Sequence, residues 1–169
     1  MYKRQIVKDN QGTLWLGTYF GGVNYFNPEY EIYTRYSYSS NEKKGLSNPV
    51  VGRTIEDRDG NLWIGTEGGG LNYYNRRTRE FKWYRPQEGR NSISHNNVKA
   101  LYYDADKEII WIGTHLGGLN KLDIRSGHFT HYRMEGNNPQ SLPSDIIRDI
   151  TPYKDLLIIA TQNGVCLFN

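Results

Sequence analysis

The segment Leu14-Trp15-Leu16-Gly17-Thr18 is repeated along the chain. Two close copies keep the tryptophan, the glycine and the threonine: Leu62-Trp63-Ile64-Gly65-Thr66 and Ile110-Trp111-Ile112-Gly113-Thr114. A fourth copy, Leu157-Ile158-Ile159-Ala160-Thr161, has isoleucine and alanine in place of the tryptophan and the glycine. The tryptophans stand at positions 15, 63 and 111, so the period is 48 residues. A period of this length is typical of repeat proteins, β-propellers among them.

Each copy has the same surroundings. A glycine pair and a short apolar run follow it, and then come two aromatic residues three positions apart and a polar segment. In the second unit this pattern predicts four strands, at 51–56, 62–66, 71–74 and 80–84, with a Gly-Asn turn between the first two. Four short strands in each repeat predict an all-β fold of four-stranded antiparallel β-propeller blades.

The repeated segment carries apolar side chains on both faces, whereas a half-solvated strand alternates apolar with polar residues. A blade stacked between two others buries both faces, so we place the repeated tryptophans in the core. A glycine within a strand weakens it unless close packing requires the glycine. We therefore expect a large side chain of the neighbouring blade to lie over each glycine. The structural residues of the repeat are then Trp15, Gly17, Trp63, Gly65, Trp111 and Gly113.

The number of repeats predicts an incomplete ring, since closed propellers typically have four to eight blades. We expect a partial propeller of about three to four blades over residues 1–169. Residues 1–36 are predicted to be the end of a first blade and residues 146–169 the start of a fourth. Whole blades are predicted at 50–84 and 98–132. The remaining blades would lie elsewhere in a longer parent protein.

Composition excludes several classes of function. The formal net charge is +3, and the basic residues are scattered instead of forming the stripe that binds nucleic acid, so we predict no nucleic-acid partner. A single cysteine, Cys166, rules out an internal disulfide and has no base beside it in the repeat pattern. No run is long and apolar enough to span a membrane, and no signal peptide is seen, but these absences say little if the chain is a segment of a longer protein, as the repeats predict.

Metal and cofactor patterns are weak. Asp57 and Asp59 lack the further carboxylates of a calcium loop, and we expect them to stabilise the turn instead. The histidines show no spacing that repeats with the units. We therefore predict neither a metal nor a cofactor at His95, His115, His128 or His131.

From Asp57 to Thr66, followed by Gly69-Gly70-Leu71, the sequence resembles the two-component regulator propeller repeat. Residues 9–23 match the repeat nearly as well, the copy at 104–119 has one extra residue before its tryptophan, and the fourth copy departs most. The resemblance implies the periplasmic sensor of a membrane-spanning hybrid histidine kinase of the kind found in Bacteroidetes. Such sensors commonly respond to oligosaccharides. Kinase activity would lie in other domains of the parent protein.

Ligand recognition is expected on one face of the disc. Successive turns of a blade alternate between two faces, so the turns after the second strand share a face with the long linkers between blades, at 85–97 and 133–145. Within those turns a pair of residues differs in every copy while its frame is constant, and repeat proteins place recognition at such positions. The candidate ligand-binding residues are Tyr19 and Phe20, for stacking on a sugar ring, and Glu67 and His115, for hydrogen bonds to hydroxyl groups.

Three hypotheses about function follow. The first is a ligand-sensing propeller segment that recognises an oligosaccharide and signals to a histidine kinase, with a homodimer as a further partner. The second is a propeller that serves as a platform for protein interaction, because the fold alone does not determine function. The third is a propeller lyase or glycosidase. Glycoside hydrolysis needs two facing carboxylates, and Glu67 is the only acid among the variable pairs, so we predict that this segment is not an enzyme.

Overall fold

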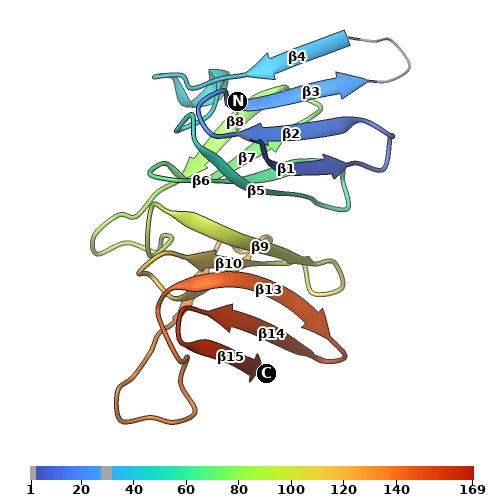
Figure 1. Cartoon of the computed structure of the whole chain (residues 1–169). Coiled ribbons are helices and arrows are strands. Elements are labelled where there is room, and N and C mark those ends of the chain that lie inside the picture. Colours follow the sequence, from blue (N-terminus) through green and yellow to red (C-terminus); the bar gives the residue numbers. More distant parts are fainter. Residues whose placement is uncertain (1–2, 28–31) are drawn as a thin grey trace.

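The computed structural model describes residues 3–27 and 32–169, which form four antiparallel sheets (Figure 1). Within each sheet the strands follow the order of the sequence. The first sheet contains β1 (Lys3–Lys8), β2 (Leu14–Thr18), β3 (Val23–Asn27) and β4 (Ile32–Tyr36). The second contains β5 (Val51–Glu56), β6 (Leu62–Thr66), β7 (Gly70–Asn75) and β8 (Glu80–Tyr84). The third contains β9 (Val98–Asp104), β10 (Ile109–Thr114), β11 (Leu119–Asp123) and β12 (Phe129–Tyr132). The last contains β13 (Ile147–Tyr153), β14 (Leu156–Thr161) and β15 (Gly164–Phe168).

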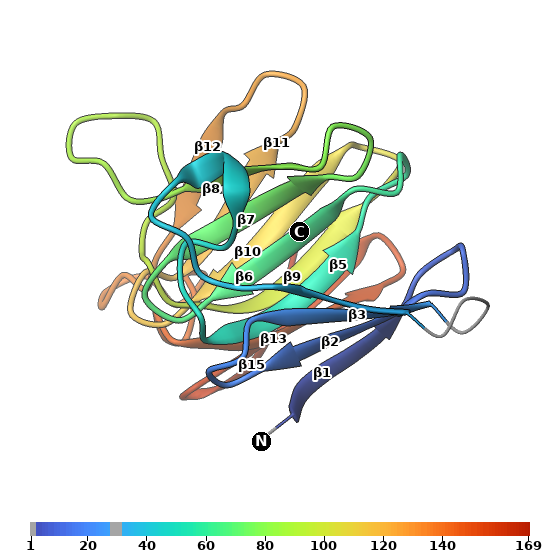
Figure 2. The same ribbon diagram turned by 90° about the horizontal axis from the view of Figure 1, so that it is seen from above.

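The sheets are stacked face to face in chain order, as the colours from blue to red show in Figure 1. Their first strands lie against one another, with β1 beside β5, β5 beside β9 and β9 beside β13. Seen from above, each sheet is rotated relative to its neighbour (Figure 2). Stacked, fanning four-stranded sheets are the arrangement of a β-propeller. The structure is therefore an all-β partial propeller, as the sequence predicted.

The core lies between the sheets. Trp63 is 2% exposed and belongs to a cluster with Ile110, Leu122 and Phe129 of the next sheet. Trp15 is buried in the corresponding cluster between the first two sheets. Trp111 packs in the same way but is only partly buried, against Phe168 of the last sheet. The tryptophans therefore pack in the core, where the two-faced apolar pattern placed them.

The mid-strand glycines allow the sheets to approach. A Cβ atom at Gly65 would lie 2.6 Å from Cγ1 of Val98, and one at Gly17 would lie 3.0 Å from Cγ1 of Val51. A Cβ at Gly113 would overlap Ile147 even more closely. A branched side chain on the first strand of the next sheet therefore covers each glycine, as the repeat predicted.

The first sheet differs from the sequence prediction. Residues 1–36 were predicted to be only the end of a blade, whereas the sheet has four strands, because β1 pairs with β2 from Lys8 opposite Leu14 to Lys3 opposite Thr18. This pairing uses backbone groups, which polar side chains do not prevent. The prediction overlooked β1 because its sequence, Lys-Arg-Gln-Ile-Val-Lys, does not resemble the first strands of the other units. Residues 1–2 and 28–31, within the predicted boundary, lie outside the described residues.

One short element was not predicted. A 3₁₀ helix, η1 (Glu42–Lys44), lies in the linker between the first two sheets, and the side chain of Asn41 accepts a hydrogen bond from the backbone of Lys43 at its start. Across the two described ranges, no helix is long and apolar enough to cross a membrane.

Candidate functional site

The turns after β2, β6 and β10 lie at the same end of the sheets as the linkers, on the left in Figure 1. We call the surface formed by residues 19–20, 67–68, 115–116 and 162–163, together with the linkers 85–97 and 133–145, the loop face. In its first three turns a threonine hydroxyl donates to the carbonyl oxygen four residues later: Thr18 to Gly22, Thr66 to Gly70 and Thr114 to Gly118, each at 2.9 Å. In the fourth, Thr161 donates to Gly164, three residues later, at 2.8 Å. The backbone of the first three turns is thus held in the same way, and the two residues that follow the threonine lie on the outside of each turn.

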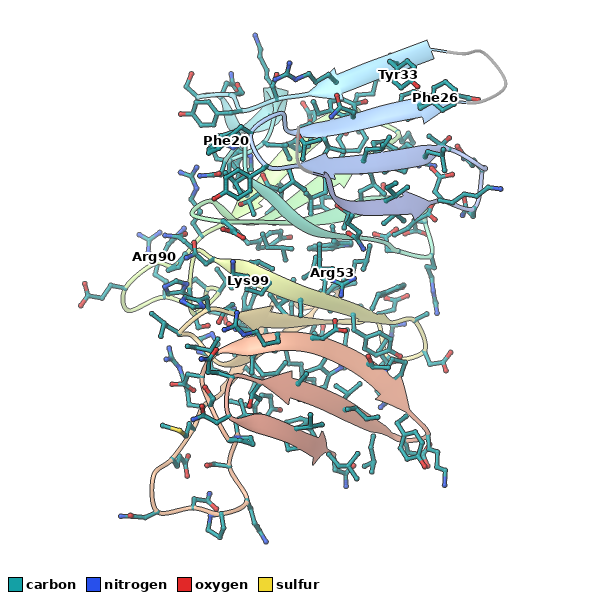
Figure 3. All side chains as sticks on the ribbon, in the orientation of Figure 1. Phe20, Phe26, Tyr33, Arg53, Arg90 and Lys99 are labelled. Carbon is teal, nitrogen blue, oxygen red and sulfur yellow. The ribbon has the colours of Figure 1, made fainter. Side chains whose placement is uncertain are left out.

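The first turn of the loop face presents two aromatic side chains. Tyr19 and Phe20 meet edge to face, with ring centroids 4.5 Å apart. Phe20 is 70% exposed, and Figure 3 shows it at the loop-face end of the first sheet. An exposed aromatic ring of this kind can stack on the apolar face of a sugar ring or on an apolar side chain of another protein.

The second turn presents a charge pair. The ammonium of Lys99, on β9, lies 2.6 Å from a carboxylate oxygen of Glu67. The two side chains keep about a quarter and a fifth of their surface exposed. Glu67 therefore acts together with Lys99, and the pair offers both an acceptor and a donor to a hydroxyl group. Lys99 was not among the residues predicted from the sequence, because its pair with Glu67 joins adjacent sheets and depends on how they stack.

The third turn presents His115 beside a second histidine. Nδ1 of His115 is buried and has no hydrogen-bond partner among the described residues. Nδ1 of His95, in the preceding linker, accepts a hydrogen bond of 3.0 Å from the backbone nitrogen of Asn97. Burial lowers the pKa of His95, and the nearby charges of His115 and Arg133 lower it further. The lowered pKa favours the neutral form of His95, which adds a polar group to this part of the loop face.

The linkers hold the third turn in place. The hydroxyl of Ser94 donates to the carbonyl of Gly117 at 2.7 Å, and Arg133 donates to the carbonyl of Leu116 at 3.1 Å. Leu116 has a φ of +74° and is 56% exposed, whereas the second turn has a glycine, Gly68, at the same position. A leucine in the left-handed region is strained, and such strain persists where the surroundings hold it and often marks functional surfaces.

The predicted site residues share the loop face but come from three different sheets. Tyr19 and Phe20 lie on the first, Glu67 on the second and His115 on the third. The structure therefore places them along one surface, one group per blade, which suits an extended ligand. Their role in binding stays a prediction.

Other candidates have structural surroundings. The carboxylate of Asp57 accepts from the backbone of Asp59 and Asn61, which confirms that Asp57 stabilises its turn. Burial raises the pKa of Cys166, so its thiol is less readily ionised than a free one. Among residues 3–27 and 32–169, no three His, Cys, Asp or Glu side chains gather in a group able to hold a metal ion.

The chain matches the sequence model of the family described as "two component regulator propeller" at residues 2–20, 45–68 and 92–115. Each match ends within or just after a loop-face turn. No curated protein sequence matches the chain.

Solved structures share its architecture. The extracellular domain assigned to the hybrid two-component system BT3049 of B. thetaiotaomicron is 27% identical, with a TM-score of 0.81 over 99% of this chain and 24% of that chain. The extracellular domain assigned to the one-component system BT4673 of the same organism is 25% identical, with a TM-score of 0.78 over 98% and 21% of the two chains. A streptogramin B lyase is 11% identical, with a TM-score of 0.64 over 99% and 54%, and this likeness shows the fold alone.

These comparisons bear on the class of protein. The two relatives at 25% and 27% identity are described as extracellular domains of a one-component and a hybrid two-component system, in agreement with the prediction that this segment is not an enzyme. The chain spans less than a quarter of the length of either one. The family model matches three of the four copies of the repeat that the sequence suggested. The chain is therefore a partial β-propeller in which three segments match the two-component regulator propeller model.

Proposed function

We propose that this chain is a ligand-sensing segment of a hybrid two-component system, located in the periplasm, and that it recognises an oligosaccharide on the loop face. The observation that carries the proposal is the likeness, over 99% of the chain, to the extracellular domain assigned to a hybrid two-component system. A histidine kinase elsewhere in the parent protein receives the signal.

The chemistry of the loop face suits a sugar chain. The exposed ring of Phe20 offers a stacking surface, and the Glu67–Lys99 pair offers an acceptor and a donor to hydroxyl groups. His115 adds a polar group on the next blade. Because these groups lie on successive sheets, a ligand several sugar units long contacts all of them at once, whereas a single sugar contacts one.

The loop face is also joined to the linkers that connect the blades. The backbone nitrogen of Glu67 donates to the carbonyl of Val50, and that of His115 donates to the carbonyl of Asn97, both at 2.9 Å. A ligand that binds these turns therefore also contacts segments that set the position of one sheet against the next. We expect the signal to be a change in how the propeller docks on a dimer partner or on a following domain. Its size is limited by the difference in ligand affinity between the two arrangements.

A second candidate function is a platform for protein interaction. The observation that favours it is the exposure of two apolar side chains on the loop face, Phe20 at 70% and Leu116 at 56%. Exposed apolar groups of this kind also contact protein partners. The experiment below distinguishes the two functions.

The test is calorimetry of the complete extracytoplasmic part of the parent protein against a panel of oligosaccharides. The variant that combines Tyr19→Ala, Glu67→Ala and His115→Ala is expected to lose binding. The matched control is Tyr153→Ala, which removes an exposed tyrosine at the opposite end of the sheets and is expected to keep it. Binding that the triple variant retains contradicts the loop face as the site. Absence of binding to any oligosaccharide favours the protein-interaction platform.

A further inference from the structure

A cavity of about 370 Å³ lies between the first two sheets, at the end of the strands opposite the loop face. The first sheet contributes Tyr25 and Tyr36, both partly exposed, and the second contributes Tyr74 and the side chains of Arg76 and Arg79 from the turn after β7. Gln11 and Thr34 supply further polar groups to the wall. Phe26 and Tyr33, labelled in Figure 3, lie on the same hairpin of the first sheet.

The next interface keeps the aromatic side of this set, with Trp63, Tyr73 and Tyr84 in place of Trp15, Tyr25 and Tyr36, but differs on the side of the later sheet. The strand pairing Tyr74–Phe81 corresponds to Leu122–Phe129, so Leu122, Ile124 and Gly127 stand where the first interface has Tyr74, Arg76 and Arg79. Leu122 belongs to the hydrophobic cluster around Trp63, and Ile124 packs against that cluster. On the side of the later sheet, the second interface thus has two aliphatic residues and a glycine where the first has a tyrosine hydroxyl and two guanidinium groups.

Arg79 occupies a position that is unfavourable for its backbone. Its φ is +60°, and the equivalent Gly127 has a φ of +70°. Both residues close the same turn, with the backbone nitrogen donating to the carbonyl four residues earlier, at 2.8 Å and 2.9 Å. Glycine adopts this conformation freely, whereas a residue with a Cβ does so at a cost in stability. An arginine here is consistent with selection for its side chain rather than for its backbone.

The second arginine is held rigidly. The guanidinium of Arg76 forms an ion pair with the fully buried carboxylate of Asp9 and lies 5.4 Å from the ring of Trp15. Because Asp9 lies behind Arg76, no carboxylate lines the cavity among the residues that the structure describes. Arg79, in contrast, is exposed, so its positive charge is available at the mouth.

The tyrosines add a hydrogen-bond donor. The hydroxyls of Tyr36 and Tyr74 lie 2.7 Å apart, and only one of them can donate to the other. The remaining hydroxyl hydrogen is available to a ligand, since a hydroxyl group can both donate and accept. Burial raises the pKa of Tyr74, so this hydroxyl stays protonated at physiological pH.

We propose that this cavity binds an acidic monosaccharide unit, a six-membered ring that carries hydroxyl groups and one carboxylate. The carboxylate pairs with Arg79 at the mouth, the hydroxyls meet the Tyr36–Tyr74 pair and Thr34, and the ring lies against Tyr25. The site is separate from the loop face, and the proposal goes beyond the function proposed above.

The test is titration of the purified protein with glucuronate, glucose and benzoate, followed by calorimetry and tryptophan fluorescence. Glucuronate is expected to bind at least about tenfold more tightly than glucose, which lacks the carboxylate. Arg79→Gly is expected to weaken glucuronate binding about tenfold or more, the usual effect of losing a charged hydrogen bond. Since glycine suits the backbone at this position, the loss cannot be attributed to unfolding.

Two matched variants locate the site. Arg77→Ala removes the same charge from a residue of the same turn that does not line the cavity, and it is expected to bind glucuronate within about twofold of the unchanged protein. The loop-face triple variant is also expected to keep binding. The inference is overturned if Arg79→Gly binds glucuronate unchanged, if glucose or benzoate binds as tightly as glucuronate, or if the loop-face variant abolishes glucuronate binding. The last result would place the acidic sugar on the loop face and leave the proposed function standing.

Discussion

The interface between the first and second sheets and the interface between the second and third use the same frame with different contents. In both, a tryptophan packs in a hydrophobic cluster with residues of the next sheet, and a glycine on the same strand lets the two sheets approach. At the end opposite the loop face, the first interface is polar, because Arg76 forms an ion pair with Asp9. In the second, Ile124 packs against the hydrophobic cluster there. The repeat thus determines the residues at the centre of each interface, where side chains pack on all sides. The residues at the outer end of the interface differ from one pair of sheets to the next.

The same contrast is seen within equivalent turns. Asp9 and Asp57 both accept a hydrogen bond from the indole nitrogen of the repeated tryptophan, at 2.7 Å from Trp15 and 3.0 Å from Trp63. Asp9 also pairs with Arg76 of the neighbouring sheet. The turn of the first sheet is therefore tied to the second sheet through an ion pair.

The largest effect is expected from breaking the apolar interface. Trp63→Ala should lower the free energy of unfolding by about 4 kcal/mol, because it removes a fully buried side chain and leaves a cavity. Trp111→Ala should cost clearly less, since Trp111 is only partly buried. Chemical denaturation followed by circular dichroism measures both. Equal losses would show that the partial exposure of Trp111 has no energetic consequence.

Breaking the polar interface should have the next largest effect. Asp9→Asn should cost about 3 kcal/mol, since it leaves Arg76 without its buried partner. Asp57→Asn leaves an amide oxygen to accept from the backbone of Asp59 and Asn61 and removes the acceptor of the Trp63 indole, so it should cost about 1 kcal/mol. The same denaturation experiment compares them, and a similar cost for the two would contradict the importance of the Asp9–Arg76 pair.

The pH dependence of the free energy of unfolding tests the contribution of Asp9 in a second way. Burial alone would raise the pKa of Asp9, but hydrogen bonds from Trp15 and Arg76 outweigh burial and lower it below 3.8. A carboxyl whose pKa is lowered by folding stabilises the protein above its unfolded value and loses this contribution as the pH falls through the folded value. Stability should therefore decline below about pH 4, and Asp9→Asn should decline less steeply over that range.

A smaller effect is expected at the glycines. Gly65→Ala should cost about 2 kcal/mol, because the new methyl group would overlap the side chain of Val98. Gly17→Ala should cost less, since its methyl group would meet Val51 at the longer distance of 3.0 Å. Thermal unfolding of the two variants measures which one loses more stability. A larger loss in Gly17→Ala would mean that the first interface is the more tightly packed one.

The smallest effect is a gain. Arg79→Gly should raise stability by up to about 1 kcal/mol, because it relieves a positive φ at an exposed turn. The reciprocal change Gly127→Arg should lower stability by a similar amount. Differential scanning calorimetry detects shifts of this size, and a loss of stability in Arg79→Gly would show that the arginine holds the interface together.

Much of the fold could be predicted from the sequence. The bounds of β5, β6 and β8 agree with the predicted ranges, and the branched side chains over the glycines were expected. Periodicity carries this information because every repeat must bury the same two faces. The polar strand β1 was missed, since its pairing depends on backbone groups that composition does not reveal.

The candidate site could be predicted only in outline. The variable turns were located correctly on one face, but the Glu67–Lys99 pair and the neighbouring His95 depend on how adjacent sheets and linkers stack. The cavity beside Arg79 could not be predicted either, because its lining residues lie on four strands and two turns that meet only after the sheets are stacked. Equivalent positions can be compared between blades only once the strand pairing is known.

The most direct test of the loop face is hydrogen exchange of the backbone amides, measured by mass spectrometry on the complete extracytoplasmic part with and without the oligosaccharide that calorimetry identifies. The account predicts slower exchange in the turns at 18–22, 66–70 and 114–118 and in the linker at 85–97, with little change in the turns at the opposite end of the sheets. Slower exchange confined to those opposite turns, or no change anywhere in this chain, would contradict it.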